Sequence, residues 1–161
     1  MAASLGGEAL TTDKVEIAQL LLIKSYLERY GWEYEADGID ALMTGFTIGD
    51  ETFTLSIRCA DDVVYLTIPH IADAPLLACV HQTYQYLLQA NCSTALTKFG
   101  LDEAGHIVLA AELPANLLSY ELFVCALFML GFNAQAQKDI LNDVTSNPGF
   151  VSPYSRIRES K

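Results

Sequence analysis

The sequence is poor in basic residues, with nine Lys and Arg against 20 Asp and Glu and a formal net charge of −11. This charge repels phosphate backbones, so we expect no nucleic-acid partner. Long apolar runs are also lacking, because the longest, 122–130, is about half of what a bilayer requires. Residues 1–5 lack the basic start of a signal peptide. We therefore expect a cytoplasmic protein that does not insert into membranes.

Catalytic and cofactor motifs are absent as well. The sequence holds no phosphate-binding loop, no dinucleotide-binding glycine pattern and no GxSxG motif. Its three histidines, His70, His81 and His106, show no spacing typical of metal ligands, and the four cysteines form no CxxC pair and are expected to be buried. Paired carboxylates fall in predicted turns, where Asp bonds the local backbone. We expect no enzyme, no catalytic residues, no metal and no cofactor.

What is present fits one globular domain. The chain has 161 residues, and 52% of them are hydrophobic, which is enough for a substantial core. We predict a flexible N-terminal arm over 1–12, a single domain over 13–147 and a polar C-terminal tail over 148–161.

The periodicity predicts an α+β fold, an antiparallel sheet with helices in the order α-β-β-β(-β)-α-β-β-α. Residues 52–59 alternate apolar and polar side chains, which is typical of a strand with one solvated face. Asp13 and Asp73 are predicted to begin the first two helices, and Pro69 to end a strand. The expected helices cover 13–30, 73–90 and 118–144, and the expected strands cover 32–35, 41–48, 52–59, 63–68, 94–101 and 106–113.

The second predicted helix carries an apolar arc of about 200°, wider than a helix on one sheet needs. A second copy of the chain would cover the surplus. The predicted dimer interface therefore comprises Leu76, Cys79, Thr83, Tyr86 and Ala90.

Three surfaces are candidates for binding a partner protein. Ile17 and Leu21 form an apolar spot on the polar side of the first helix. Trp32 and Tyr34 are expected on or near a sheet edge. The solvated strand face contributes the third candidate, with Thr54, Ser56 and Arg58. Each surface also has an alternative interpretation without a partner: exposed apolar residues at random for Ile17 and Leu21, core aromatics for Trp32 and Tyr34, and a solvated strand for the third.

Four segments resemble the YbjN family and the type III secretion chaperone-like fold. They are a helix end (84–91, YQYLLQAN), a strand (98–102, KFGLD), a strand after a Gly turn (105–109, GHIVL) and the ELP before the last helix (112–114). The resemblance spans residues 13–145. It implies a homodimer that binds an extended client segment, partly by strand addition and partly in apolar grooves.

Two functions follow as hypotheses. The first is a non-catalytic, homodimeric chaperone or assembly factor that holds a segment of a client protein, with a basic segment favoured by the acidic surface. The alternative is a small-molecule-binding regulatory protein or an unrecognised enzyme with a pocket between sheet and helices.

Overall fold

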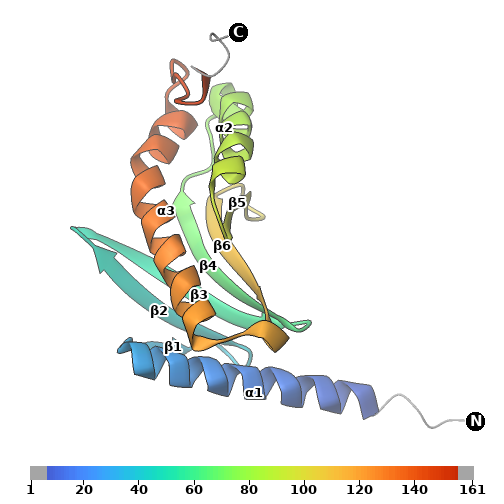
Figure 1. The fold of residues 1–161 in the computed structure, drawn as a ribbon. Coiled ribbons are helices and arrows are strands. Elements are labelled where there is room, and N and C mark those ends of the chain that lie inside the picture. Colours follow the sequence, from blue (N-terminus) through green and yellow to red (C-terminus); the bar gives the residue numbers. More distant parts are fainter. Residues whose placement is uncertain (1–6, 156–161) are drawn as a thin grey trace, which may run out of the picture.

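The computed structural model describes residues 7–155, with side chains from Glu16 onward. Three α-helices and six strands follow one another along the chain in the predicted order (Figure 1). The helices are α1 (Gly7–Tyr30), α2 (Val80–Ser93) and α3 (Tyr120–Ser146), with short 3-10 turns at Leu77–Cys79 and Ala115–Leu117. The strands are β1 (Tyr34–Ala36), β2 (Ala41–Ile48), β3 (Glu51–Ala60), β4 (Val63–Ala72), β5 (Thr97–Leu101) and β6 (Ile107–Pro114).

All strands pair antiparallel in one sheet with the order β1-β2-β3-β4-β6-β5. Figure 1 shows α2 and α3 side by side over the sheet, and α1 crossing near the start of α3. Tyr26 of α1 contacts the rings of Tyr120 and Phe123, which fixes this crossing. The α+β prediction is confirmed.

The core lies between the sheet and its helices. Phe53, Leu55, Ile57 and Cys59 of β3 are buried, and Thr54 and Arg58 between them are exposed. The predicted alternation is thus confirmed. From α3, buried side chains extend along nearly its whole length because the helix crosses several strands.

The helix starts differ from the predictions. α1 begins at Gly7 rather than Asp13, so residues 7–12 of the predicted arm are helical, and residues 1–6 lie outside the described part. α2 begins at Val80, after the 3-10 turn Leu77–Cys79, and the Asp73 carboxylate instead bonds the ring of His70. α3 has Ser119 as its N-cap, whose side chain accepts from the Leu122 N–H at 3.1 Å.

Strand β4 does not end at Pro69 as predicted. It continues to Ala72 through an irregularity, because Ile68 pairs with Leu109 and Ala72 pairs with Ile107. More residues on β4 than on β6 lie between these pairs, so the strand bulges there. The bulge accommodates Pro69, which lacks an N–H, and His70, whose φ is 57°.

The predicted dimer interface is wrong for four of its five residues. Cys79, Thr83, Tyr86 and Ala90 are at most 1% exposed within a single chain, and only Leu76 is exposed. The chain itself covers the wide apolar arc of α2. Thr83 donates to the Val144 carbonyl of α3, and the Tyr86 ring lies against Phe150 and Tyr154.

In the predicted tail, Phe150 and Tyr154 thus pack against the core, whereas Val151 and Ser155 are exposed. Residues 156–161 lie outside the described part. Cys59 and Cys79 are buried as expected, but Cys92 and Cys125 are exposed. No helix among residues 7–155 is long and apolar enough to cross a membrane.

Candidate protein-binding surface

The end of α1 fixes the position of Trp32. Gly31, with a φ of 83°, donates its N–H to the Glu28 carbonyl, and Trp32 donates to the Leu27 carbonyl. This hydrogen-bond pair is the Schellman motif, which requires a residue in the left-handed region directly after the helix. The chain then turns toward β1 and places the indole ring on the inner face of the sheet edge.

An aromatic groove lies beside Trp32, between the end of β2 and α3. Trp32 stacks on Phe46 with ring centres 5.4 Å apart, and Phe128 stacks on Phe132 of α3. The groove has a volume of about 310 Å³ and is lined by Tyr30, Trp32, Phe46, Thr47, Ile48, Leu127, Phe128, Gly131, Phe132 and Gln135. Phe128 and Phe132 are 65% and 57% exposed, so large apolar side chains line a groove open to solvent.

Gly131 sets how closely the groove walls approach. A Cβ added there would lie 3.3 Å from the Ile48 Cδ1 and 3.5 Å from a Phe46 ring carbon. The glycine thus lets α3 pass close to the end of β2, which brings the two phenylalanines of α3 next to the sheet edge.

The edge of the sheet is open next to this groove. Strand β1 pairs only with Leu42–Thr44 of β2, so residues 45–48 have no neighbouring strand on that side within residues 7–155. Asp37 donates its N–H to the Ala41 carbonyl on the β1 side. Since hydrogen-bonding direction alternates along an antiparallel strand, Gly45 and Thr47 also direct their backbone groups to that side.

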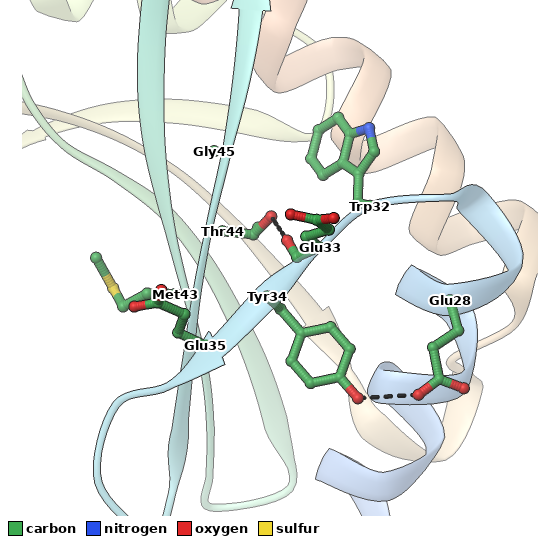
Figure 2. Close-up of a pocket in the computed structure, with 8 residues that line it drawn as sticks. All are labelled: Glu28, Trp32, Glu33, Tyr34, Glu35, Met43, Thr44 and Gly45. Carbon is green, nitrogen blue, oxygen red and sulfur yellow. Dashed lines mark hydrogen bonds between the residues drawn. The ribbon is translucent and has the colours of Figure 1, made fainter.

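A second hollow, the edge pocket, lies where β1 joins β2 (Figure 2). It has a volume of about 670 Å³ and is lined by Glu28, Trp32, Glu33, Tyr34, Glu35, Met43, Thr44 and Gly45. All of its charged residues are glutamates. The Tyr34 hydroxyl donates to the Glu28 carboxylate at 2.9 Å, and this hydrogen bond raises the pKa of Tyr34. The Thr44 hydroxyl donates to the Glu33 carbonyl at 2.6 Å, and this bond holds the residue directly before β1 against β2.

The other edge of the sheet is covered. The Asn91 side chain accepts from the Phe99 N–H at 2.7 Å and donates to the Phe99 carbonyl at 3.0 Å. It thereby occupies the place that a neighbouring strand would take beside β5. On the opposite side of the sheet, β1 and the free half of β2 form an edge without a neighbouring strand within residues 7–155, and a strand can add there.

The structure places the predicted partner-binding residues in three separate regions. Ile17 and Leu21 are exposed on α1, at 46% and 60%. Trp32 and Tyr34 lie at the sheet edge, where the sequence predicts them. The remaining three, Thr54, Ser56 and Arg58, lie on the opposite face of the sheet from the groove, where Arg58 pairs with Asp40 at 3.0 Å.

Sequence analysis missed Phe46, Phe128 and Phe132 as parts of this surface. A signal was available, because residues 120–132 are apolar nearly all round, more than the packing of one helix face requires. The open half of β2 gave no signal, since it depends on where the short β1 strand ends.

Comparisons with known proteins bear on the fold. No protein-family model matches the chain, and no curated protein matches it in sequence. Among solved structures, the ExsC–ExsE complex matches with a TM-score of 0.57 and 18% identity, covering 81% of this chain and 96% of the other. The ExoU–SpcU complex of the Pseudomonas aeruginosa type III secretion system matches with a TM-score of 0.51 and 20% identity, covering 75% and 95%.

The chain has the type III secretion chaperone-like fold. The predicted resemblance is confirmed at this level. YbjN from E. coli also matches, with a TM-score of 0.49 and 18% identity over 73% of this chain and 93% of YbjN. At these identities the likeness concerns the fold, and the binding chemistry has to be argued from the residues of this chain.

Proposed function

We propose that this protein is a non-catalytic binding module that holds an extended segment of a client protein, as a chaperone or assembly factor does. The observation that carries the proposal is the free half of β2 next to the aromatic groove. A client strand would bond the backbone of Gly45 and Thr47 and insert its inward side chains into the groove.

Four residues of free edge correspond to about 13 Å of extended chain. This length admits a short strand with one or two side chains on the groove side, because successive side chains alternate between faces. Backbone hydrogen bonds would hold the segment, and large apolar side chains against Trp32 and Phe128 would give selectivity. Apolar anchors in such pockets supply most of the binding energy of protein interfaces.

Charge favours a basic client. The edge pocket presents Glu28, Glu33 and Glu35 without any basic residue, and the whole chain has a net charge of −11. Lys or Arg next to the apolar positions of a client would be attracted to these carboxylates, and that attraction weakens as salt is raised.

The space between sheet and helices gives less support to the small-molecule alternative. Leu66, Leu109, Phe123 and Leu130, which line this space from both sides, are fully buried by one another and their neighbours. The described groove and edge pocket instead open at the side of the sheet. Solved structures of the same fold contain complexes of two proteins, ExsC with ExsE and ExoU with SpcU, which also supports a protein ligand.

The experiment is affinity capture from the native cell, identification of the bound protein by mass spectrometry, and direct binding measurements with that protein. Thr47→Pro removes one N–H at the free edge without removing a backbone bond to β3, so it should abolish binding. Thr47→Ala should preserve binding, and it is matched to the proline variant because both lose the hydroxyl contact with Thr52. Phe128→Ala should weaken binding at least tenfold. Leu117→Ala is the matched control, since Leu117 is 66% exposed and lies outside the groove.

Two results would reject the proposal. One is that the captured protein binds Thr47→Pro and Phe128→Ala as well as it binds the wild type. The other is that no protein is retained by the wild type more than by the Phe128→Ala variant.

We further propose a homodimer through the outward face of α2. Tyr84 and Leu88 are exposed at 41% and 69%, and their spacing of four residues puts them on one side of the helix. Leu77, in the 3-10 turn directly before α2, is 93% exposed and extends this apolar stripe. This stripe replaces the buried residues of the sequence-based interface and keeps the same helix. A two-fold axis would pack each stripe against its copy and remove both from water.

A further inference from the structure

Two histidines that are far apart in the sequence meet on the surface. The rings of His70 and His106 are stacked with their centres 4.2 Å apart. The His70 Nε2 lies 2.7 Å from the Asp73 carboxylate. One ligand atom from each of His70, Asp73 and His106 lies within 4.8 Å of the other two. Sequence spacing gave no sign of this group, because 36 positions separate the two histidines in the printed chain.

The fold explains why these residues meet. His70 lies in the bulge of β4, and a bulge redirects the side chain it carries. Directly after the bulge, Ala72 pairs with Ile107, which places His106 beside the chain that leaves β4. The turn before His106 packs there as well, since a Cβ on Gly105 would lie 3.6 Å from the Ala74 Cβ.

His106 is already oriented as metal-binding histidines are. Its Nδ1 bonds the Asp102 carboxylate at 3.0 Å, which leaves its Nε2 free. Asp102 is itself held, because its other oxygen accepts from the N–H groups of Ala104 and His106. Burial pushes the pKa of Asp102 up, but these hydrogen bonds outweigh it and hold the pKa below its usual value. Carboxylates that bond the second ring nitrogen fix the orientation of metal-bound histidines.

We propose that His70, Asp73 and His106 bind a divalent transition metal of the Zn²⁺ type. Two imidazole nitrogens and one carboxylate oxygen are a ligand set that Zn²⁺ accepts, with water in the remaining position. His70 would bind through Nε2 with its proton on Nδ1, and the metal would replace the present hydrogen bond to Asp73. His106 would bind through Nε2 with its Nδ1 proton on Asp102.

Metal binding requires these side chains to rearrange. Donor atoms around tetrahedral Zn²⁺ lie about 3.3 Å apart, given metal–ligand distances of about 2.0–2.1 Å. The His70 Nε2 and the Asp73 oxygen are closer than this, at 2.7 Å, so they would have to move apart. A shared metal must also lie near the planes of both imidazole rings, so the stacked ring of His70 would have to rotate relative to that of His106. The side chains of His70 and Asp73 are 50% and 84% exposed, which leaves room for this rotation. A bound metal would tie the loop after β4 to the turn between β5 and β6.

Calorimetric titration of the untagged full chain with Zn²⁺ tests the site, in a Cys92→Ser/Cys125→Ser background that removes the two exposed thiols. We expect one Zn²⁺ per chain and a rise in Tm on binding. His70→Ala and His106→Ala should each weaken binding at least tenfold. Asp102→Asn should weaken it by about tenfold, as is typical when a carboxylate behind a metal-bound histidine is lost.

The matched control is His81→Ala, because His81 is exposed on α2 outside the cluster and should leave binding unchanged. Co²⁺ added in place of Zn²⁺ gives a second readout, with visible absorption bands that should disappear in His70→Ala. The variants change surface side chains, and circular dichroism checks that each one folds. The proposal is overturned if the wild type binds no Zn²⁺ saturably, or if His70→Ala and His106→Ala bind it as His81→Ala does.

Discussion

Replacing Asn91 with alanine is expected to destabilise the fold by releasing the covered edge of β5. The asparagine amide makes two hydrogen bonds to one residue, accepting from the Phe99 N–H and donating to the Phe99 carbonyl. Alanine removes both, and it leaves two partly buried backbone groups of β5 without partners.

The expected loss follows from these two bonds. A hydrogen bond contributes about 1 kcal/mol net, and an unsatisfied buried group costs about 1–3 kcal/mol. We therefore expect the free energy of unfolding to fall by about 2–3 kcal/mol. For a chain of this size, each kcal/mol lowers Tm by about 2–4 °C, so Tm should fall by roughly 4–12 °C.

Urea unfolding followed by circular dichroism measures this loss. Asn91→Asp separates the role of the amide from that of size, because a carboxylate can accept from the Phe99 N–H but would place its second oxygen against the Phe99 carbonyl. It should be about as unstable as the alanine variant. Asn142→Ala is the control, since Asn142 is exposed on α3. The reasoning is refuted if Asn91→Ala loses no more stability than this control.

Three further outcomes are expected. Leu88→Glu should weaken the proposed dimer at least about 100-fold, because burial of a leucine contributes about 1.5–3 kcal/mol and the residue occurs twice in the interface. Analytical ultracentrifugation measures this change, and a wild type that sediments as a monomer would contradict the proposed dimer. Burial raises the pKa of Tyr86 to about 12, so stability should fall as pH rises from about 10 to about 12, and Tyr86→Phe should flatten this slope in urea titrations. Burial also raises the pKa of Cys59 to about 11, whereas Cys125 is exposed. At pH 8 a thiol reagent should therefore label Cys125 in the native protein and Cys59 only after unfolding. Equal labelling rates for the two cysteines in the native protein would refute this expectation.

The sign of the Tyr86 effect follows from which form the fold favours. Burial disfavours the phenolate, so the folded-state pKa lies above that of the unfolded chain. The stabilising effect is complete below the unfolded-state pKa and is lost as pH rises through the folded-state value. Tyr86→Phe removes the titrating group and isolates this contribution from other groups that ionise in alkali.

Local patterns predicted most of the elements. The alternation in β3 identified its buried face, and Gly31 marked the end of α1, because both depend on neighbours within a few residues. The error at Pro69 has a local cause too. Proline excludes regular pairing, but a bulge lets the strand continue, and bulges depend on the register of the partner strand.

The apolar arc of α2 shows what local sequence patterns cannot predict, namely which part of the structure covers an apolar helix face. The sequence correctly indicated that Tyr86 needs cover, but it could not tell cover by another copy from cover by Phe150 and Tyr154, which lie far along the same chain. The surplus on that face therefore gives no evidence for a dimer, and the exposed stripe with Leu88, on which the proposed dimer rests, became visible only in the folded chain.

By itself, the sequence determined the α+β class, the order of the elements and the acidic character of the surface, because periodicity and charge are local or additive properties. Only the tertiary structure decided which sheet edge is free, how Trp32 and Phe128 come to line one groove, and that His70 meets His106. Each of these depends on strand register and helix crossing, which are fixed by contacts between residues distant in the chain.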